Sequence, residues 1–211
     1  MSYCVFFDLD ETIIKKKSML EVIKIYYKEN YLSFIDLEKS LLQYKSNNKN
    51  RSDLNSFFYS QFRGISVRKM CKVSQEWFVD NINTIFNSFI LSEIKKHQEL
   101  GADIFIVSGS FFECVEPIAN HLNINHVICT KLEQEIGIYT GKMLSDPVIG
   151  KGKELAILNY IKNHKFSLKN SYAYGDHSSD IYMLSLVENP IVVGANQKLL
   201  KYARKEGWLI A

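Results

Sequence analysis

The pattern of apolar and polar positions divides the chain into a helical part near the N-terminus and an alternating strand and helix part after it. Residues 5–7 form a short apolar run typical of a buried strand. Between residues 14 and 85, apolar side chains recur with the three- and four-residue spacing of helices. The helices predicted in this part cover residues 18–31, 36–44, 54–62, 67–71 and 77–90. A polar stretch at residues 46–52 predicts a loop.

The remainder of the chain alternates short apolar runs with stretches of helical period. Strands are predicted at residues 104–107, 127–129, 171–174 and 191–193. Helices are predicted at residues 94–100, 112–122, 154–163 and 181–186, with a hairpin at 135–142. This alternation indicates an α/β fold with a doubly wound, Rossmann-like parallel sheet. We predict that residues 1–13 and 86–211 form the core domain and that residues 14–85 form a small all-helical cap.

Composition and charge exclude several classes of partner. The 211 residues suffice for a core domain and a smaller one, and the net charge of +3 comes from mixed acids and bases without a basic stripe. We therefore expect no nucleic-acid partner. We also expect no membrane partner and a cytoplasmic location, because the sequence has neither a long apolar run nor the layout of a signal peptide. The four cysteines form no CxxC pair and are expected to be reduced and buried.

Two aspartates stand where the first strand ends. Asp8 and Asp10 are two positions apart, so alternation points their side chains the same way. Two carboxylates beside a buried strand repel each other unless a cation or a proton offsets their charge. The pair suits a Mg²⁺ site in which one aspartate attacks and the other moves protons.

Polar groups also follow other strands of the predicted sheet. Ser108 and Gly109 follow the strand at 104–107, Lys153 begins a helix, and Asp176 and Asp180 follow the strand at 171–174. Sites in such sheets collect at the carboxyl ends of the strands. This set supplies what phosphoryl transfer needs: a nucleophile, an acid/base, a hard-cation cage and donors to phosphate oxygens.

The ordered set DxDxT, Ser, Lys and GDxxxD resembles the haloacid dehalogenase superfamily, over nearly the whole chain. Within it, the chain is most similar to the phosphoserine-phosphatase-like subfamily IB, whose helical cap directly follows the first motif. The tail, with residues 189–193 and Gly207-Trp208, is common in that subfamily. The resemblance implies a Mg²⁺-dependent phosphatase that hydrolyses a small phosphate monoester through an aspartyl phosphate.

The resemblance also implies roles for single residues. Asp8 attacks phosphorus, and Asp10 protonates the leaving oxygen and then takes a proton from water. Asp8, the backbone carbonyl of Asp10, and Asp176 hold the metal, and Asp180 either joins them or orients a bound water. The residues implied in phosphate binding are Thr12, which fixes the loop after the nucleophile, Ser108, Gly109 and Lys153. Lys151 is an alternative to Lys153, and His177 and Ser179 are as compatible with a loop surface as with the site.

The cap argues against phosphoserine as the substrate. Phosphoserine enzymes of this group carry a cap Glu and a cap Arg, and those positions fall near Lys17 and Phe58. Lys17 would repel an ammonium group, and Phe58 cannot pair with a carboxylate. Glu21 or Arg63 are substitutes if the register is shifted. Aromatic side chains are frequent in the cap, and most of them are expected in its core.

Three other functions compete with the phosphatase. A phosphotransferase or mutase would use the same core. A phospho-accepting signalling domain also uses a strand-end aspartate, but it lacks an acid/base two residues on and a helical cap. A non-catalytic binding protein is expected to have lost Asp8 or Asp10, and both are present.

Overall fold

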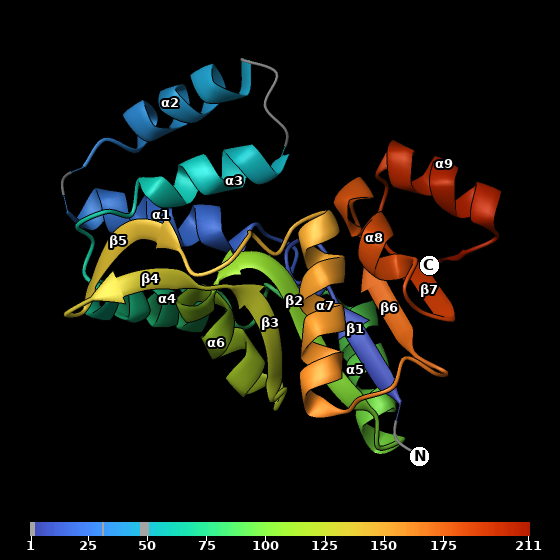
Figure 1. Cartoon of the computed structure of the whole chain (residues 1–211). Coiled ribbons are helices and arrows are strands. Elements are labelled where there is room, and N and C mark those ends of the chain that lie inside the picture. Colours follow the sequence, from blue (N-terminus) through green and yellow to red (C-terminus); the bar gives the residue numbers. More distant parts are fainter. Residues whose placement is uncertain (1–2, 31, 47–50) are drawn as a thin grey trace.

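A six-stranded parallel sheet lies at the centre of the computed structural model, which describes residues 3–30, 32–46 and 51–211 (Figure 1). The strand order is β3-β2-β1-β6-β7-β8, and every neighbouring pair is parallel. The strands are β1 (Cys4–Phe7), β2 (Asp103–Phe111), β3 (His126–Thr130), β6 (Tyr172–Gly175), β7 (Asn189–Val192) and β8 (Leu209–Ile210). The predicted parallel sheet is confirmed, and β8 is an additional strand that was not predicted.

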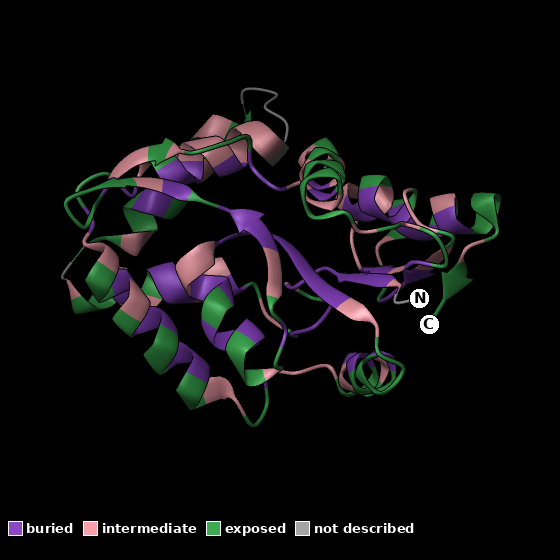
Figure 2. Ribbon diagram, turned by 60° about the horizontal axis from the view of Figure 1, so that its bottom comes forward, coloured by how far each residue is buried: buried purple, intermediate pink, exposed green. Residues whose placement is uncertain are grey.

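The two faces of the sheet bury alternate residues against different helices. Val5 and Phe7 of β1 join the apolar cluster on one face, whereas Cys4 and Phe6 join the cluster on the other. The first face is covered by α5 (Ser88–Glu99) and α6 (Phe112–His121). The second face is covered by α7 (Lys151–His164), α8 (Ile181–Leu184) and α9 (Gln197–Glu206). Figure 2 shows the buried strands running between helices whose outer sides are exposed.

Four helices lie between β1 and α5 in the described part of the chain: α1 (Ser18–Glu29), α2 (Phe34–Ser46), α3 (Arg51–Ser60) and α4 (Val67–Asn81). The predicted helices at 67–71 and 77–90 are wrong in their bounds, because one continuous helix covers residues 67–81. Its buried residues recur at helical spacing: Met70, Val73, Ser74, Trp77 and Phe78. The chain then turns, and the Asn87 side chain caps α5. Of the predicted loop at 46–52, residues 47–50 lie outside the described residues.

The helical layer shares an apolar cluster with one face of the sheet. Side chains of α1, α3 and α4 belong to the same apolar cluster as Val5 and Phe7. The predicted hairpin is confirmed as β4 (Leu132–Glu135) and β5 (Ile138–Met143). Its Tyr139 pairs with the segment after α3, through bonds of 2.9 Å from the Gly64 amide and to the Ile65 carbonyl. The helical layer thus includes a segment from outside residues 14–85, and the domain division stays a prediction.

Two further predictions from the sequence concern membrane-spanning helices and the state of the cysteines. None of the helices in the described part of the chain combines the length and hydropathy of a bilayer span. The four cysteines are free, as expected. Cys4, Cys114 and Cys129 are buried, but the prediction is wrong for Cys71, which is only half-buried on α4.

Candidate active site

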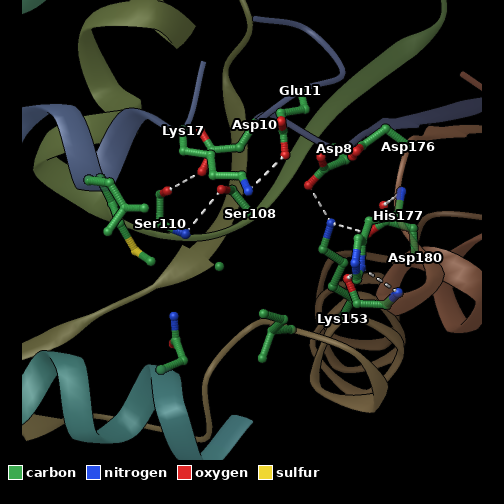
Figure 3. A pocket seen from close by; sticks show the side chains of 16 residues that line it. Asp8, Asp10, Glu11, Lys17, Ser108, Ser110, Lys153, Asp176, His177 and Asp180 are labelled. Atoms are coloured by element: carbon green, nitrogen blue, oxygen red, sulfur yellow. Dashed lines mark hydrogen bonds and ion pairs between the residues drawn. The ribbon is translucent and has the colours of Figure 1, made fainter. Parts of the chain in front are cut away.

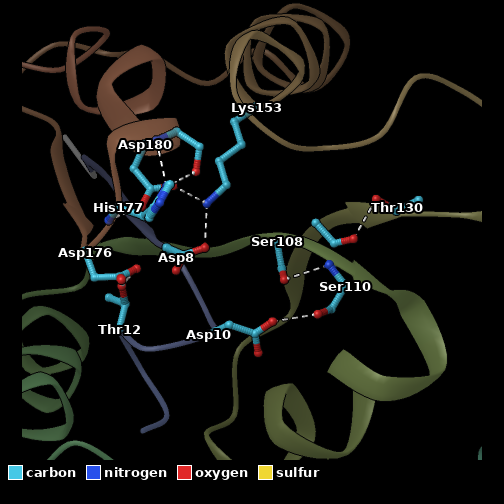
Figure 4. A network of polar contacts seen from close by, with 12 residues as sticks. Asp8, Asp10, Thr12, Ser108, Ser110, Thr130, Lys153, Asp176, His177 and Asp180 are labelled. Atoms are coloured by element: carbon cyan, nitrogen blue, oxygen red, sulfur yellow. Dashed lines mark hydrogen bonds and ion pairs between the residues drawn. The ribbon is translucent and has the colours of Figure 1, made fainter. Parts of the chain in front are cut away.

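The carboxyl ends of β2, β1 and β6 bring the predicted site residues together (Figure 4). Asp8 directly follows β1, and its amide donates to the Tyr174 carbonyl of β6 at 3.0 Å. Asp176 directly follows β6, and Ser108 lies in β2. Because these strands are parallel neighbours, residues almost 170 positions apart in the sequence meet at one edge of the sheet.

A buried lysine joins two of the carboxylates. Lys153, in the first turn of α7, is 2% exposed, and its Nζ donates to Asp8 Oδ1 at 2.5 Å and to Asp180 Oδ1 at 2.7 Å. Burial by itself lowers the pKa of Lys153, but the charges of Asp180 and Asp8 outweigh it and raise that pKa above its ordinary value. Lys151, the alternative from the sequence, is exposed.

Asp8, Asp176 and Asp180 form a cluster of carboxylates. One oxygen from each lies within 4.8 Å of the others. Burial raises the pKa of Asp8 well above its usual range, against the opposing effect of Lys153. Burial, followed by the charge of Asp180, raises the pKa of Asp176 to about 6. Three acids against one ammonium leave excess negative charge, and oxygen donors are the ligands that Mg²⁺ prefers, so the cluster fits this ion.

Neighbouring groups hold this cluster in place. The Thr12 hydroxyl, which is fully buried, donates to Asp176 Oδ1 at 3.3 Å. The His177 amide donates to Asp180 Oδ2 at 3.0 Å, within the turn that leads to α8. Gly175 allows the close approach of Asp180, since a Cβ atom at Gly175 would lie 2.7 Å from the Asp180 Cβ. Thr12, predicted among the phosphate-binding residues, therefore bonds to Asp176.

The Asp10 carboxylate is held by two serines that sequence reasoning missed. Its Oδ1 accepts from the backbone amide and the hydroxyl of Ser18, at 2.8 and 2.6 Å, and its Oδ2 accepts from the Ser110 hydroxyl at 2.9 Å. Burial raises the pKa of Asp10, and the bonds from Ser18 and Ser110 oppose that rise. Ser18 is the first residue of α1, so the aspartate also binds an unpaired amide at a helix N-terminus.

Ser108 lies on the opposite side of Asp8 from Asp180 (Figure 4). The Ser108 hydroxyl is buried and accepts from the Ser110 amide at 3.0 Å. The Gly109 carbonyl accepts from the Thr130 hydroxyl at 3.0 Å and from the Tyr59 hydroxyl of α3 at 2.7 Å. These bonds connect β2 to the end of the neighbouring strand β3 and to α3 of the helical layer.

A small pocket of about 70 Å³ opens beside these residues (Figure 3). Asp8, Asp10, Asp176, Asp180 and Lys153 line it, together with the predicted Ser108, Gly109, His177, Ser179 and Lys17. Lys17 forms an ion pair of 3.2 Å with Glu11, which also lines the pocket.

A cavity of about 830 Å³ continues from this pocket toward α2, α3 and α9. Phe58 lines this cavity. Arg63 does not line either space; it is exposed and lies beside the β4–β5 hairpin. Glu21, the other substitute considered from the sequence, also lies outside the lining of both spaces. Of the three cap positions predicted for specificity, Lys17 and Phe58 thus lie at the cavity and Arg63 lies away from it.

Comparison with known proteins gives the class of the protein. Residues 5–185 match the model of the haloacid dehalogenase-like hydrolases, and the chain belongs to this family of enzymes. It is 29% identical over 209 residues to a probable phosphatase of Mycobacterium tuberculosis, covering 96% of this chain and 72% of that one. It is 22% identical over 210 residues to a histidinol-phosphatase of Neisseria meningitidis, covering 96% and 95%.

Solved structures share the fold. A protein of unknown function from Bordetella pertussis superimposes with a TM-score of 0.89 at 20% identity, over 100% of this chain and 98% of that one. Phosphoserine phosphatase in its apo form superimposes with a TM-score of 0.68 at 18% identity, over 96% and 90%. The resemblance expected from the motifs, to the haloacid dehalogenase superfamily and its phosphoserine-phosphatase-like members, is confirmed.

Proposed function

We propose that this chain is a Mg²⁺-dependent phosphomonoesterase that hydrolyses a small phosphate ester through an aspartyl phosphate on Asp8. The observation that carries the proposal is the buried contact of Lys153 with both Asp8 and Asp180, beside the third carboxylate of Asp176. A nucleophilic carboxylate and a phosphate dianion repel each other, and an ammonium group between them offsets that repulsion.

The acidic cluster would hold the metal. Asp8, Asp176 and Asp180 would bind Mg²⁺ together with the backbone carbonyl of Asp10, and the ion supplies positive charge that offsets the repulsion between carboxylates and phosphoryl group. Thr12 orients Asp176 through its hydrogen bond. Lys153, the Ser108 hydroxyl and the Gly109 amide are the proposed contacts of the phosphate oxygens.

The proposed reaction has two displacements at phosphorus. In the first, an Oδ atom of Asp8 bonds to phosphorus while the bond to the ester oxygen breaks, and Asp10 gives a proton to the departing alcohol. In the second, Asp10 takes a proton from a water whose oxygen attacks phosphorus, and the bond to Asp8 breaks to release inorganic phosphate. Ser18 and Ser110 orient Asp10 for both proton transfers.

Phosphate release from p-nitrophenyl phosphate and a panel of phosphate esters tests this function. The names of relatives place histidinol phosphate and phosphoserine in the panel. We predict poor use of phosphoserine, because Lys17 at the cavity would repel its ammonium group and Phe58 cannot pair with its carboxylate.

The metal requirement is tested separately. We expect EDTA to abolish phosphate release and added Mg²⁺ to restore it. Full activity in metal-free buffer would contradict the role of the cation, and transfer to an added alcohol in place of phosphate release would favour a phosphotransferase. A cytoplasmic location stays a prediction, supported by the free cysteines.

A further inference from the structure

The larger cavity beside the active-site pocket is lined by basic side chains. Lys17, Lys45 and Lys198 line it, and no aspartate or glutamate does so among the residues that the structure describes. The three lysines come from separate segments: Lys17 precedes α1, Lys45 lies in the last turn of α2, and Lys198 lies in the first turn of α9. The whole chain has nearly as many acids as bases, 23 against 26, so the excess positive charge is specific to this cavity.

Two of these lysines are open to a ligand. The charge of Lys17 is offset by its ion pair with Glu11. Lys45 and Lys198 form no ion pair with a carboxylate of the described residues, and both are exposed. They line the cavity but not the pocket, so they lie beyond the junction of the two spaces. An anionic group in the cavity would therefore meet two ammonium groups that water can already reach.

Apolar side chains line the way from the pocket to these lysines. Three of them line both spaces: Met19, Leu20 and Ile149. On α2, Leu41 lies one helical turn before Lys45, so both share the face that lines the cavity. On α3, Leu54 and Phe58 are likewise four residues apart and both line the cavity. A ligand that extends from the pocket to Lys45 and Lys198 thus passes apolar side chains before it reaches charge.

We propose that the substrate is a phosphate ester whose alcohol has an apolar segment and a second anionic group at its far end, and that Lys45 and Lys198 bind this second group. The inference rests on the proposed phosphatase function. The pocket of about 70 Å³ holds the reacting phosphoryl group, and the cavity of about 830 Å³ has room for the rest of the alcohol. A carboxylate and a phosphate group share the required charge, whereas an ammonium group would be repelled.

The test compares matched esters of six-carbon alcohols with the purified enzyme and Mg²⁺: hexyl phosphate, 6-phosphooxyhexanoate, hexane-1,6-diyl bisphosphate and 6-aminohexyl phosphate. We expect kcat/KM for the two esters with a second anion to exceed that for hexyl phosphate by about 5- to 30-fold at low salt, after correction for the two equivalent phosphates of the bisphosphate. We expect 6-aminohexyl phosphate to be the poorest. The better of the two anionic esters identifies the second group as a carboxylate or a phosphate.

The kinetic signature distinguishes a binding contact from a contact with the reacting atoms. Because the second anion lies away from phosphorus, the preference should appear mainly in KM, with a smaller change in kcat. Because Lys45 and Lys198 are exposed, added NaCl should reduce the preference.

Charge-reversed variants then assign the preference to the two lysines. Lys45→Glu combined with Lys198→Glu should bring the ratio of 6-phosphooxyhexanoate to hexyl phosphate to about one or below, and should raise the use of 6-aminohexyl phosphate relative to hexyl phosphate. Lys201→Glu makes the same change of charge at an exposed position of α9 outside the cavity lining. This control should keep the wild-type ratio, and circular dichroism checks that each variant is folded.

The outcomes separate the two proposals. Similar kcat/KM for hexyl phosphate and both anionic esters, or wild-type ratios in the double variant, would overturn the inference and leave the phosphatase function intact. An equal loss of preference in Lys201→Glu would also overturn it, since general charge would then account for the effect. Should the double variant fail to fold, wild-type ratios in both single variants overturn it. Absence of phosphate release from p-nitrophenyl phosphate and from all four esters, with Mg²⁺ present, would instead contradict the proposed function itself.

Discussion

The sheet side and the helical side of the cavity differ in how completely their polar groups are paired. At the sheet edge, Lys153 holds two carboxylates, and Ser18 and Ser110 hold Asp10. On the helical side, the amide of Asn55 faces largely apolar neighbours and its Oδ1 has no partner among the described residues. The difference indicates that the polar groups of the sheet edge are organised before the substrate arrives, whereas the helical side lines the cavity mainly with apolar side chains.

The largest expected effect is the loss of the nucleophile on the sheet side. Asp8→Asn should lower kcat for p-nitrophenyl phosphate by about 10³-fold or more, because an amide cannot form the aspartyl phosphate. The fold should survive, since the side chains have the same shape, and circular dichroism checks this. Hydrolysis at the wild-type rate would rule out Asp8 as the attacking group.

Removal of the buried ammonium comes next and should affect stability as well as activity. Lys153→Ala leaves Asp8 and Asp180 without their shared partner, so we expect a loss of about 3–5 kcal/mol in the free energy of unfolding. We expect kcat/KM to fall by about 10²- to 10³-fold. Lys151→Ala, two residues earlier in the same helical turn and exposed, is the control and should change neither quantity measurably. Equal effects of the two substitutions would show that the buried contact has no special role.

A smaller effect is expected for Thr12, which contacts the acidic cluster through its hydrogen bond to Asp176. Thr12→Val removes the hydrogen bond to Asp176 and should raise the Mg²⁺ concentration needed for half-maximal activity by about 10- to 100-fold, with a smaller change in kcat at saturating Mg²⁺. Thr84→Val, at an exposed turn, serves as the control. An unchanged Mg²⁺ requirement would mean that Thr12 does not act through the metal site.

The smallest effect is expected where the helical layer touches the sheet edge. Tyr59→Phe removes one donor to the Gly109 carbonyl, but the Thr130 hydroxyl still donates to it. We therefore expect a loss of about 1 kcal/mol in urea unfolding and a change in kcat/KM of about threefold or less. A tenfold loss of activity would indicate that this contact positions the reacting groups, and the contrast between the two sides would then be less sharp.

Local patterns were sufficient for five of the six strands of the sheet and for the residues at its edge. Alternation identified the strands, and the rule that sites collect at carboxyl ends brought Asp8, Ser108 and Asp176 to one place. α9 also has local signals, namely an Asn196 cap, a buried face and Gly207 at its end, and it was not predicted. β8, with two residues, is too short to produce a pattern.

The contacts that cross between layers could not be predicted in the same way. Helical period alone does not say which face of α3 turns toward a cavity, so Asn55 had no distinguishing mark in the sequence. Ser18 and Ser110 meet at Asp10 only because the start of α1 lies against the end of β2. The helices predicted at residues 67–71 and 77–90 both fall on α4, which is continuous from residue 67 to residue 81. The predicted break lies at polar residues between Cys71 and Trp77, and most of these residues are on the outer face of the helix.

The amino-acid sequence by itself determined which chemical groups stand at the ends of which strands, because a strand's alternation and a motif's spacing are local properties of the chain. The tertiary structure decided which of these groups touch. Lys153 contacts Asp8 and Asp180, which are 145 and 27 positions away in the sequence, because α7 packs on the sheet. The packing of distant segments also places Asn55 of α3 at the junction of the pocket and the larger cavity.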